Sequence, residues 1–168
     1  MPETLKNERT RTFSWTDADE IFERIKHLSG REFLEKMLAG ELPPPPIASA
    51  LNYRISEVGE GSVVFETEVA EFHYNPMAIA HGGLAATLLD TAMSCAIYTV
   101  LPPGVGNSTI ELKVNYLRPM TIRTGRVRCE GKIINVGRRT ALSEGRITDE
   151  AGKLYAHATT TCMILRNA

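Results

Sequence analysis

The sequence predicts an α+β fold in which an antiparallel sheet of about six strands wraps around a long central helix, with an N-terminal helical extension. Two observations lead to this prediction. Residues 84–100 have helical periodicity and are apolar almost all the way round, and a helix of that kind belongs in a protein interior. Segments that alternate between apolar and polar residues lie on both sides of it in the sequence. One flat sheet face would leave much of this helix exposed, so we expect the sheet to curl around it.

The N-terminal part of the chain is predicted to be a helical extension. Residues 17–26 and 31–39 each have an apolar face, and Gly40 follows the second segment, where a helix would end. The run Pro43-Pro44-Pro45-Pro46 then predicts a stiff, extended connector. We therefore expect two units: residues 1–46 as the extension with its proline-rich connector, and residues 47–168 as the main domain.

The main domain is predicted to be built from short antiparallel strands around the helix. Residues 51–56 and 63–69 alternate and flank a turn at Gly59 and Gly61, which is typical of a hairpin. After Pro102 and Pro103, which end the helix, alternation returns in residues 107–116, 126–133, 140–148 and 154–165. We expect these last segments to form an antiparallel meander. A curled antiparallel sheet around a central helix is the hotdog arrangement, and a second copy of the chain is expected to cover the rest of the helix.

The composition shows no bias toward charged partners. The chain of 168 residues is 43% hydrophobic and 23% charged, with a formal net charge of −1, so neither nucleic acid nor an anionic membrane is an expected partner. The N-terminus is polar and has no secretory signal, and polar residues interrupt the apolar helix too often for it to insert into a membrane. Cys95, Cys129 and Cys162 lack the spacing of a disulfide framework or a zinc site. We expect a cytoplasmic protein with no metal and no cofactor.

His81-Gly82-Gly83, at the start of the central helix, is the first candidate for chemistry. Backbone N–H groups at a helix start have no helical acceptor, and this end of a helix carries partial positive charge. Because the glycines have no side chains, a ligand can approach closely, which suits a developing oxyanion. Asn75, in the loop before the helix, offers an amide that can donate to a carbonyl oxygen. The alternative for these residues is structural: a tight turn with a polar cap, and an Asx turn before Pro76.

Asp90 fits its surroundings least, because it lies in the middle of the apolar helix with no Lys or Arg three or four positions away. One explanation is a half-exposed carboxylate that bonds Thr87 or Ser94 on its own helix. The other is a general base or nucleophile in an apolar pocket, where desolvation raises its basicity. Asp90 follows His81 by nine residues, which places it on nearly the opposite side of the helix and about 13 Å along the axis. The two residues can serve one reaction only across a two-fold dimer, which predicts two equivalent composite sites.

Two hydroxyl residues on the strand after the helix are further candidates. Ser108 has the same parity as Ile110 and Leu112, the face expected to lie against the helix, so its hydroxyl is a candidate for holding a water beside Asp90. Thr109 has the opposite parity and ranks below Ser108. The alternative for Ser108 is a small residue at the start of a strand.

Arg138 and Arg139 lie in a turn that follows Val136-Gly137. They form either a solvated charged surface or a cradle for the phosphates of an acyl carrier of cofactor size. No zinc-ligand motif, dinucleotide-binding motif or P-loop occurs in the sequence.

Together these residues resemble the PaaI-type hotdog thioesterases, the phenylacetic acid degradation protein-like family. The resemblance covers residues 46–165 and rests on several motifs in order: Phe72-His73-Tyr74, Asn75-Pro76, His81-Gly82-Gly83, Asp90, Ser108, Asn115-Tyr116-Leu117-Arg118-Pro119 and Val136-Gly137-Arg138-Arg139-Thr140. It implies an acyl-CoA thioesterase that hydrolyses a coenzyme A thioester to free acid and coenzyme A. It also implies a homodimer that forms the active site, usually paired into a homotetramer.

The resemblance also implies a role for each matching residue. Asn75 and the backbone N–H of Gly82 would polarise the thioester carbonyl, and His81 would shape that loop. From the neighbouring chain, Asp90 would act as general base or nucleophile, and Ser108 would position the water. The expected substrate contacts are Gly83, Thr109, Arg138 and Arg139, the two arginines lying near the nucleotide of coenzyme A.

Two alternatives to a thioesterase stay open. A non-catalytic module that binds or senses acyl-CoA is compatible with the same fold, because fold does not determine function. A hydratase or dehydratase on a hotdog scaffold also pairs a histidine with an acid, although no matching arrangement follows the His81-Gly82-Gly83 loop.

Overall fold

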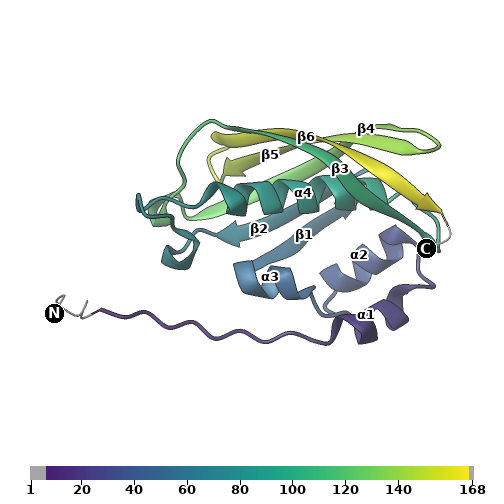
Figure 1. The fold of residues 1–168 in the computed structure, drawn as a ribbon, viewed down its shortest axis with the longest axis horizontal. Helices are drawn as coiled ribbons and strands as arrows, with labels where there is room; N and C mark the ends of the chain where they lie inside the picture. Colours follow the sequence, from purple (N-terminus) through teal and green to yellow (C-terminus); the bar gives the residue numbers. More distant parts are fainter. Residues whose placement is uncertain (1–6, 167–168) are drawn as a thin grey trace.

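The long helix α4 (Gly82–Tyr98) lies against the concave face of one curled antiparallel sheet (Figure 1). This computed structural model describes residues 7–166. The sheet has six strands in the order β1-β2-β4-β5-β6-β3. Their bounds are Tyr53–Gly59 (β1), Ser62–Glu68 (β2), Val105–Tyr116 (β3), Arg126–Val136 (β4), Thr140–Asp149 (β5) and Leu154–Arg166 (β6). The predicted hotdog fold, a sheet wrapped around a central helix, is confirmed.

The core lies between α4 and the sheet. Leu88, Leu89 and Met93 of α4 are completely buried, and glycines on the facing strands allow the helix to approach closely. A Cβ atom on Gly131 of β4 would lie 2.2 Å from the carbonyl oxygen of Ala92, so only glycine fits at that position. The opposite side of α4 is half-buried and carries Asp90, Thr91, Ser94 and Cys95. The helix is therefore buried on most of its circumference but not on all of it.

The predicted meander of the last four strands is wrong in one respect. β4, β5 and β6 do follow one another, but β3 pairs with β6 at the edge of the sheet, and β4 pairs with β2. The reason is the connection between β3 and β4, which contains Pro119 and the 3₁₀ helix η2 (Ile122–Thr124). A segment of this kind cannot form a tight hairpin turn, and it carries the chain past β6 and β5 to β4, which lies between β2 and β5.

The N-terminal extension contains the two predicted helices and one that was not predicted. α1 (Ala18–Ile25) is capped by Asp17 and α2 (Gly30–Leu38) by Ser29. The prolines do not remain extended to Pro46, because a short helix α3 (Pro46–Leu51) begins there, and β1 starts only at Tyr53. Proline at the first helical position loses nothing by lacking an N–H, since that group has no helical acceptor. The expected boundary between residues 46 and 47 stays a prediction.

α2 docks on the C-terminal end of α4 and on β1. The N–H of Gly30 donates to the carbonyl oxygen of Leu101 at 3.2 Å, and a Cβ atom on Gly30 would lie 2.0 Å from the carbonyl oxygen of Tyr98. The rings of Phe33 and Tyr98 meet edge-on with 6.1 Å between their centroids, and Leu34 is completely buried. The extension is therefore packed into the domain. Among residues 7–166, none of the helices has both the length and the apolar character needed to cross a membrane.

Candidate active site

The N-terminus of α4 is capped by the side chain of His81. Its Nδ1 accepts a hydrogen bond from the N–H of Gly83 at 2.8 Å, and a Cβ atom on Gly83 would lie only 2.9 Å from that nitrogen. Within residues 7–166, the neighbouring N–H of Gly82 has no acceptor. The cap thus provides an acceptor for the N–H of Gly83. The N–H of Gly82 remains available to a ligand, at the positive end of the helix dipole.

Asn75 lies in the loop before α4 and forms an Asx turn, which was the structural alternative for this residue. Its Oδ1 accepts from the N–H of Met77 at 2.9 Å, which fixes the orientation of the side-chain amide. The Nδ2 group makes no hydrogen bond to any residue that the structure describes. The loop closes on itself, because the N–H of Asn75 donates to the carbonyl oxygen of Ile79 at 2.8 Å. Ala78, inside this loop, has a φ of 56°.

Asn75 and Gly82 line the same cavity, which has a volume of about 390 Å³. The structure therefore brings together two of the residues expected to bind a carbonyl oxygen. The sequence did not single out Met120 or Tyr155, which contribute to the walls of this cavity. Tyr116 also lines it, and its ring would lie 3.2 Å from a Cβ atom on Gly82. Arg118 lines it as well. Tyr116 and Arg118 belong to a motif on which the family resemblance rests, and this motif is the feature of the sequence that could have pointed to them.

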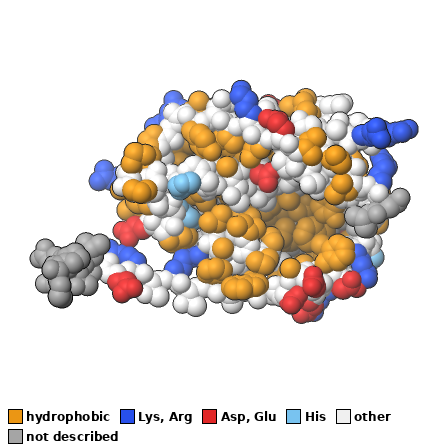
Figure 2. All heavy atoms as spheres, viewed as in Figure 1, with side chains coloured by type: hydrophobic (Ala, Val, Ile, Leu, Met, Phe, Trp, Pro, Cys, Tyr) orange, Lys and Arg blue, Asp and Glu red, His pale blue; other side chains and the backbone are white. Residues whose placement is uncertain are grey.

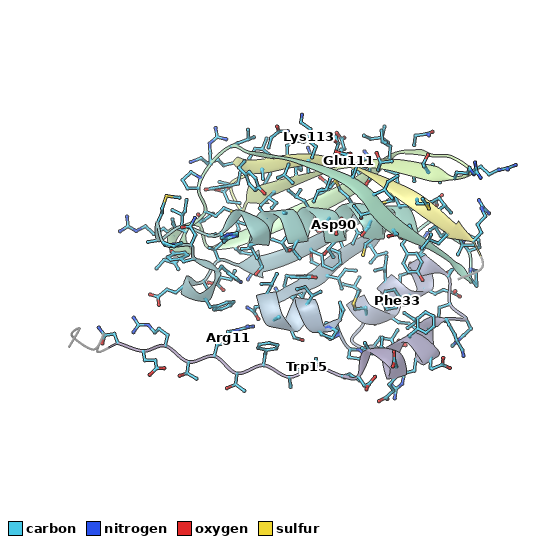
Figure 3. All side chains as sticks on the ribbon, viewed as in Figure 1. Arg11, Trp15, Phe33, Asp90, Glu111 and Lys113 are labelled. Carbon is cyan, nitrogen blue, oxygen red and sulfur yellow. The ribbon has the colours of Figure 1, made fainter. Side chains whose placement is uncertain are left out.

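Asp90 is half-buried on the open side of α4 (Figure 3). Its Oδ1 accepts a hydrogen bond from Oγ1 of Thr109 at 2.8 Å, and it forms no salt bridge with any described residue. The alternative in which Asp90 bonds Thr87 or Ser94 is not seen among the described residues, and Ser94 donates to the carbonyl oxygen of Thr91 instead. Burial, with a contribution from the Asp90 charge, raises the pKa of the neighbouring Cys95 thiol to about 12, so this thiol stays protonated near neutral pH.

The expected side-chain directions of Ser108 and Thr109 are reversed. Ser108 is exposed, whereas Thr109 faces α4 and holds Asp90. The reason is a bulge in β3: the pairing with β6 shifts between Thr109 and Glu111, so Ile110 is the extra residue and is 55% exposed. A bulge changes which residues share a face of a strand, and the parity of Leu112 therefore does not extend back to Ser108.

Asp90 does not line the cavity formed by Asn75 and Gly82. Asp90 follows Gly82 by eight positions along α4, which corresponds to about 12 Å of rise. His81 is also outside that cavity and lines a neighbouring one of about 350 Å³ together with Gly83. Within one chain, the residues with a carbonyl-binding role and the carboxylate are therefore separate.

A hollow lined with hydrophobic side chains opens between α4 and the N-terminal helices, on the face of the molecule that carries Asp90 (Figures 2 and 3). Phe33 of α2 and Tyr98 of α4, which touch each other, are only partly buried. The extension therefore contributes an apolar surface next to the open side of the central helix.

Arg138 and Arg139 lie exposed in the turn between β4 and β5. With Ile164 and Arg166 from the end of β6 they line an open cavity with a volume of about 540 Å³. The carbonyl oxygen of Arg139 accepts from the N–H of Ile164 at 2.8 Å, which ties the turn to β6. Among residues 7–166, no group of three or more His, Cys, Asp or Glu side chains is placed to hold a metal ion.

Comparison with known proteins places the chain in a family. The model of the thioesterase superfamily matches residues 77–156. The 1,4-dihydroxy-2-naphthoyl-CoA hydrolase of Listeria monocytogenes is 28% identical over 108 residues, which are 64% of this chain and 86% of the hydrolase. Human acyl-coenzyme A thioesterase 13 is 29% identical over 97 residues, 57% of this chain and 68% of the human protein.

The solved structures give the same result. A variant of the phenylacetic acid degradation protein PaaI from Thermus thermophilus is 30% identical and superimposes with a TM-score of 0.64, covering 71% of this chain and 98% of PaaI. The resemblance to PaaI-type hotdog proteins is confirmed. The chain belongs to the thioesterase superfamily and is a thioester hydrolase.

Proposed function

We propose that this protein is an acyl-CoA thioesterase, which hydrolyses a coenzyme A thioester to the free acid and coenzyme A. The observation that carries the proposal is the cavity that Asn75 and Gly82 both line, combined with a carboxylate, Asp90, that has no cationic partner among residues 7–166. The two relatives named for hydrolysis of a coenzyme A thioester support the substrate class.

The thioester carbonyl oxygen is proposed to accept from Asn75 Nδ2 and from the Gly82 N–H. This oxygen becomes negative as water adds to the carbonyl carbon, so donors fixed beforehand stabilise the transition state more than the substrate. The α4 dipole adds to this effect. His81 acts indirectly, because its bond to the Gly83 N–H fixes the first turn of the helix. Gly83 is proposed to contribute by leaving room for the capping ring of His81, because a Cβ atom on Gly83 would lie 2.9 Å from its Nδ1.

Asp90 of a second copy of the chain is proposed to supply the base. It takes a proton from the attacking water while the new C–O bond forms, and it returns that proton to the sulfur as the C–S bond breaks. Thr109 orients the carboxylate through the 2.8 Å bond to Oδ1, which is a different role from the positioning of water expected of Ser108. Direct attack by the carboxylate, with a mixed anhydride that water then cleaves, is the alternative route for the same residue.

A second copy of the chain is proposed because the site is incomplete in one. Within residues 7–166, β3 pairs only with β6, so its other edge is unpaired there, and long unpaired edges are usually covered. The exposed fractions of Ile110 and Tyr116 on this strand are 55% and 58%. Pairing through this edge would give a homodimer, with a homotetramer as the further assembly and the cytoplasm as the location. Sedimentation at several protein concentrations tests the assembly.

The two ends of the substrate are proposed to bind outside the reaction centre. Arg138, Arg139 and Arg166 suit the phosphates of coenzyme A, because a guanidinium offers paired donors to phosphate oxygens. The acyl group is proposed to lie in the apolar hollow between α4 and the N-terminal helices (Figure 2).

A thiol-release assay with a panel of aromatic and straight-chain acyl-CoA substrates tests the proposal. We expect turnover by the purified protein, and a loss of about 10²- to 10⁴-fold in kcat for Asp90→Asn, the usual range for a lost general base. Glu60→Gln, the same change of carboxylate to amide at an exposed turn, is the matched control and should keep full activity. A stable complex with acyl-CoA but no hydrolysis would favour a binding module instead.

A further inference from the structure

The N-terminal arm, residues 7–16, is extended and passes below α3 before it enters α1 (Figure 1). Most of its side chains are exposed, but Arg11 is half-buried and reaches toward the body of the domain (Figure 3). Its guanidinium donates from Nη1 to the carbonyl oxygen of Ala50 at 2.6 Å and from Nη2 to that of Ser49 at 2.7 Å. These carbonyls are in the last turn of α3, where no helical N–H is available to them. Arg11 thus fastens the arm to α3.

The same guanidinium contacts the loop that leads to the active site. It lies over the ring of Phe72, 4.2 Å from the centroid, in the geometry of a cation–π interaction. Phe72 belongs to the 3₁₀ helix η1 (Glu71–His73), and its ring centroid is 4.1 Å from that of His73. One arginine therefore bridges α3 and η1.

His73 continues this connection toward the helix start. It is buried, and its Nε2 bonds the carbonyl oxygen of Leu51 in α3 at 2.8 Å, while its Nδ1 accepts from the N–H of Ala70 at 3.1 Å. The carbonyl oxygen of His73 accepts from the N–H of His81 at 2.7 Å. His81 in turn caps Gly83, so a chain of direct contacts runs from Arg11 to the backbone beside Gly82.

We propose that Arg11 is a positioning residue for thioester hydrolysis: it holds η1 against α3 and so fixes the loop that carries Asn75, His81 and Gly82. This inference rests on the proposed function of Asn75 and Gly82. It makes the N-terminal arm, which lies before the region matched by the family model, a working part of the catalytic site.

The kinetic signature follows from what Arg11 holds in place. The donors stabilise charge that develops only in the transition state, so a displaced loop lowers kcat more than it raises KM. Misplacement of reacting groups by about 1 Å can cost 10²-fold in rate. We expect Arg11→Ala to lower kcat about 10-fold and to change KM less than about threefold.

Arg9→Ala is the matched control on the same arm. Among the residues that the structure describes, Arg9 pairs with Glu71 alone, at 3.1 Å, and both side chains are mostly exposed, so the loss of this pair contributes little. We expect its kcat to stay within about twofold of the wild type. Arg11→Lys keeps the charge but loses the two-pronged donor and its planar stacking. Its kcat should lie between that of the wild type and that of Arg11→Ala.

The experiment combines steady-state kinetics of the full chain with amide hydrogen exchange over residues 70–84. Supporting results are a selective loss of kcat and several-fold faster exchange of this segment in Arg11→Ala but not in Arg9→Ala. A kcat for Arg11→Ala equal to that of Arg9→Ala, with unchanged exchange, would overturn the proposal. If Arg11→Ala does not fold, Arg11→Lys against Arg9→Lys carries the same comparison. A wild-type protein that does not hydrolyse acyl-CoA would contradict the proposed function. The exchange comparison would still test whether Arg11 holds η1 against α3.

Discussion

The hydroxyl of Thr109 donates to Oδ1 of Asp90 across 2.8 Å, from a strand at the edge of the sheet to the middle of the central helix. Within residues 7–166, Oδ2 of Asp90 has no hydrogen-bond partner. One carboxylate oxygen is therefore fixed by the protein, and the other is available to a water molecule. A single bond sets the orientation of the proposed base.

Thr109→Val tests whether this bond matters for the reaction. Valine has the shape of threonine without the donor, so Asp90 loses a charged hydrogen bond of about 1.5–3 kcal/mol, and kcat should fall about tenfold or more. Ser108→Ala, one position away on an exposed side chain, should change kcat less than twofold, a difference of about 0.4 kcal/mol. Steady-state kinetics of both variants shows whether Thr109 or Ser108 supports the reaction. A larger loss in Ser108→Ala would restore the assignment made from strand parity.

Asn75→Asp tests the carbonyl-binding role of the amide. The aspartate keeps the oxygen that accepts from Met77, so the turn is retained, but the amide donor becomes a negative oxygen. We expect kcat to fall at least about 10²-fold, the usual result of losing one oxyanion donor. Asn135→Asp, on an exposed position of β4, controls for the added charge. Unchanged kcat in Asn75→Asp would mean that the amide does not face the reacting carbonyl.

Gly30→Ala tests the docking of the N-terminal extension on α4. The added Cβ atom would lie 2.0 Å from the carbonyl oxygen of Tyr98, so α2 must move away from α4. Overpacking of this kind costs about 1–3 kcal/mol, which urea denaturation measures directly. Gly106→Ala, where no atom of residues 7–166 outside the neighbouring positions lies within 4 Å of the new Cβ, is the control. Equal stability of both variants would show that α2 is not fastened at this point.

The ionisation of His73 should make stability depend on pH. Burial lowers the pKa of His73 below its ordinary value, so the folded chain binds this proton less readily than the unfolded chain. The contribution of the neutral ring is complete above the unfolded pKa of about 6.5 and is lost as the pH falls through the folded pKa. Urea denaturation at about pH 7.5 and 5.5, on either side of the unfolded pKa, should show a decrease in the wild type that is smaller in His73→Gln. The same pH dependence in both proteins would contradict this role of His73.

The sequence predicted the elements of the main domain because their periodicities are long and clear. The helix α4 and the alternating strands were found within a few residues. The site for a carbonyl oxygen at the glycines of the helix start stays a prediction. The order of the strands was harder to predict, because it depends on a connection, residues 117–125, whose path is determined by packing against the rest of the sheet.

Three features were outside the reach of sequence patterns for specific reasons. The bulge at Ile110 reverses strand parity, and nothing in the alternation of residues 107–116 marks it. α3 begins at the last of four prolines, where composition favours an extended chain. Arg11 contacts Phe72, which is 61 residues away in sequence, and a contact over such a separation has no local pattern.

The most direct test of the shared active site is complementation between two inactive variants. Asp90→Asn and Asn75→Asp are each expected to be inactive as homodimers. In a mixed dimer, one site carries both substitutions and the other carries neither, so an equal mixture that exchanges subunits freely should recover about a quarter of the wild-type activity. Native mass spectrometry of the same mixture confirms the mixed dimers. Recovery of activity in proportion to them is the predicted result, and mixed dimers without activity would contradict a site built from two chains.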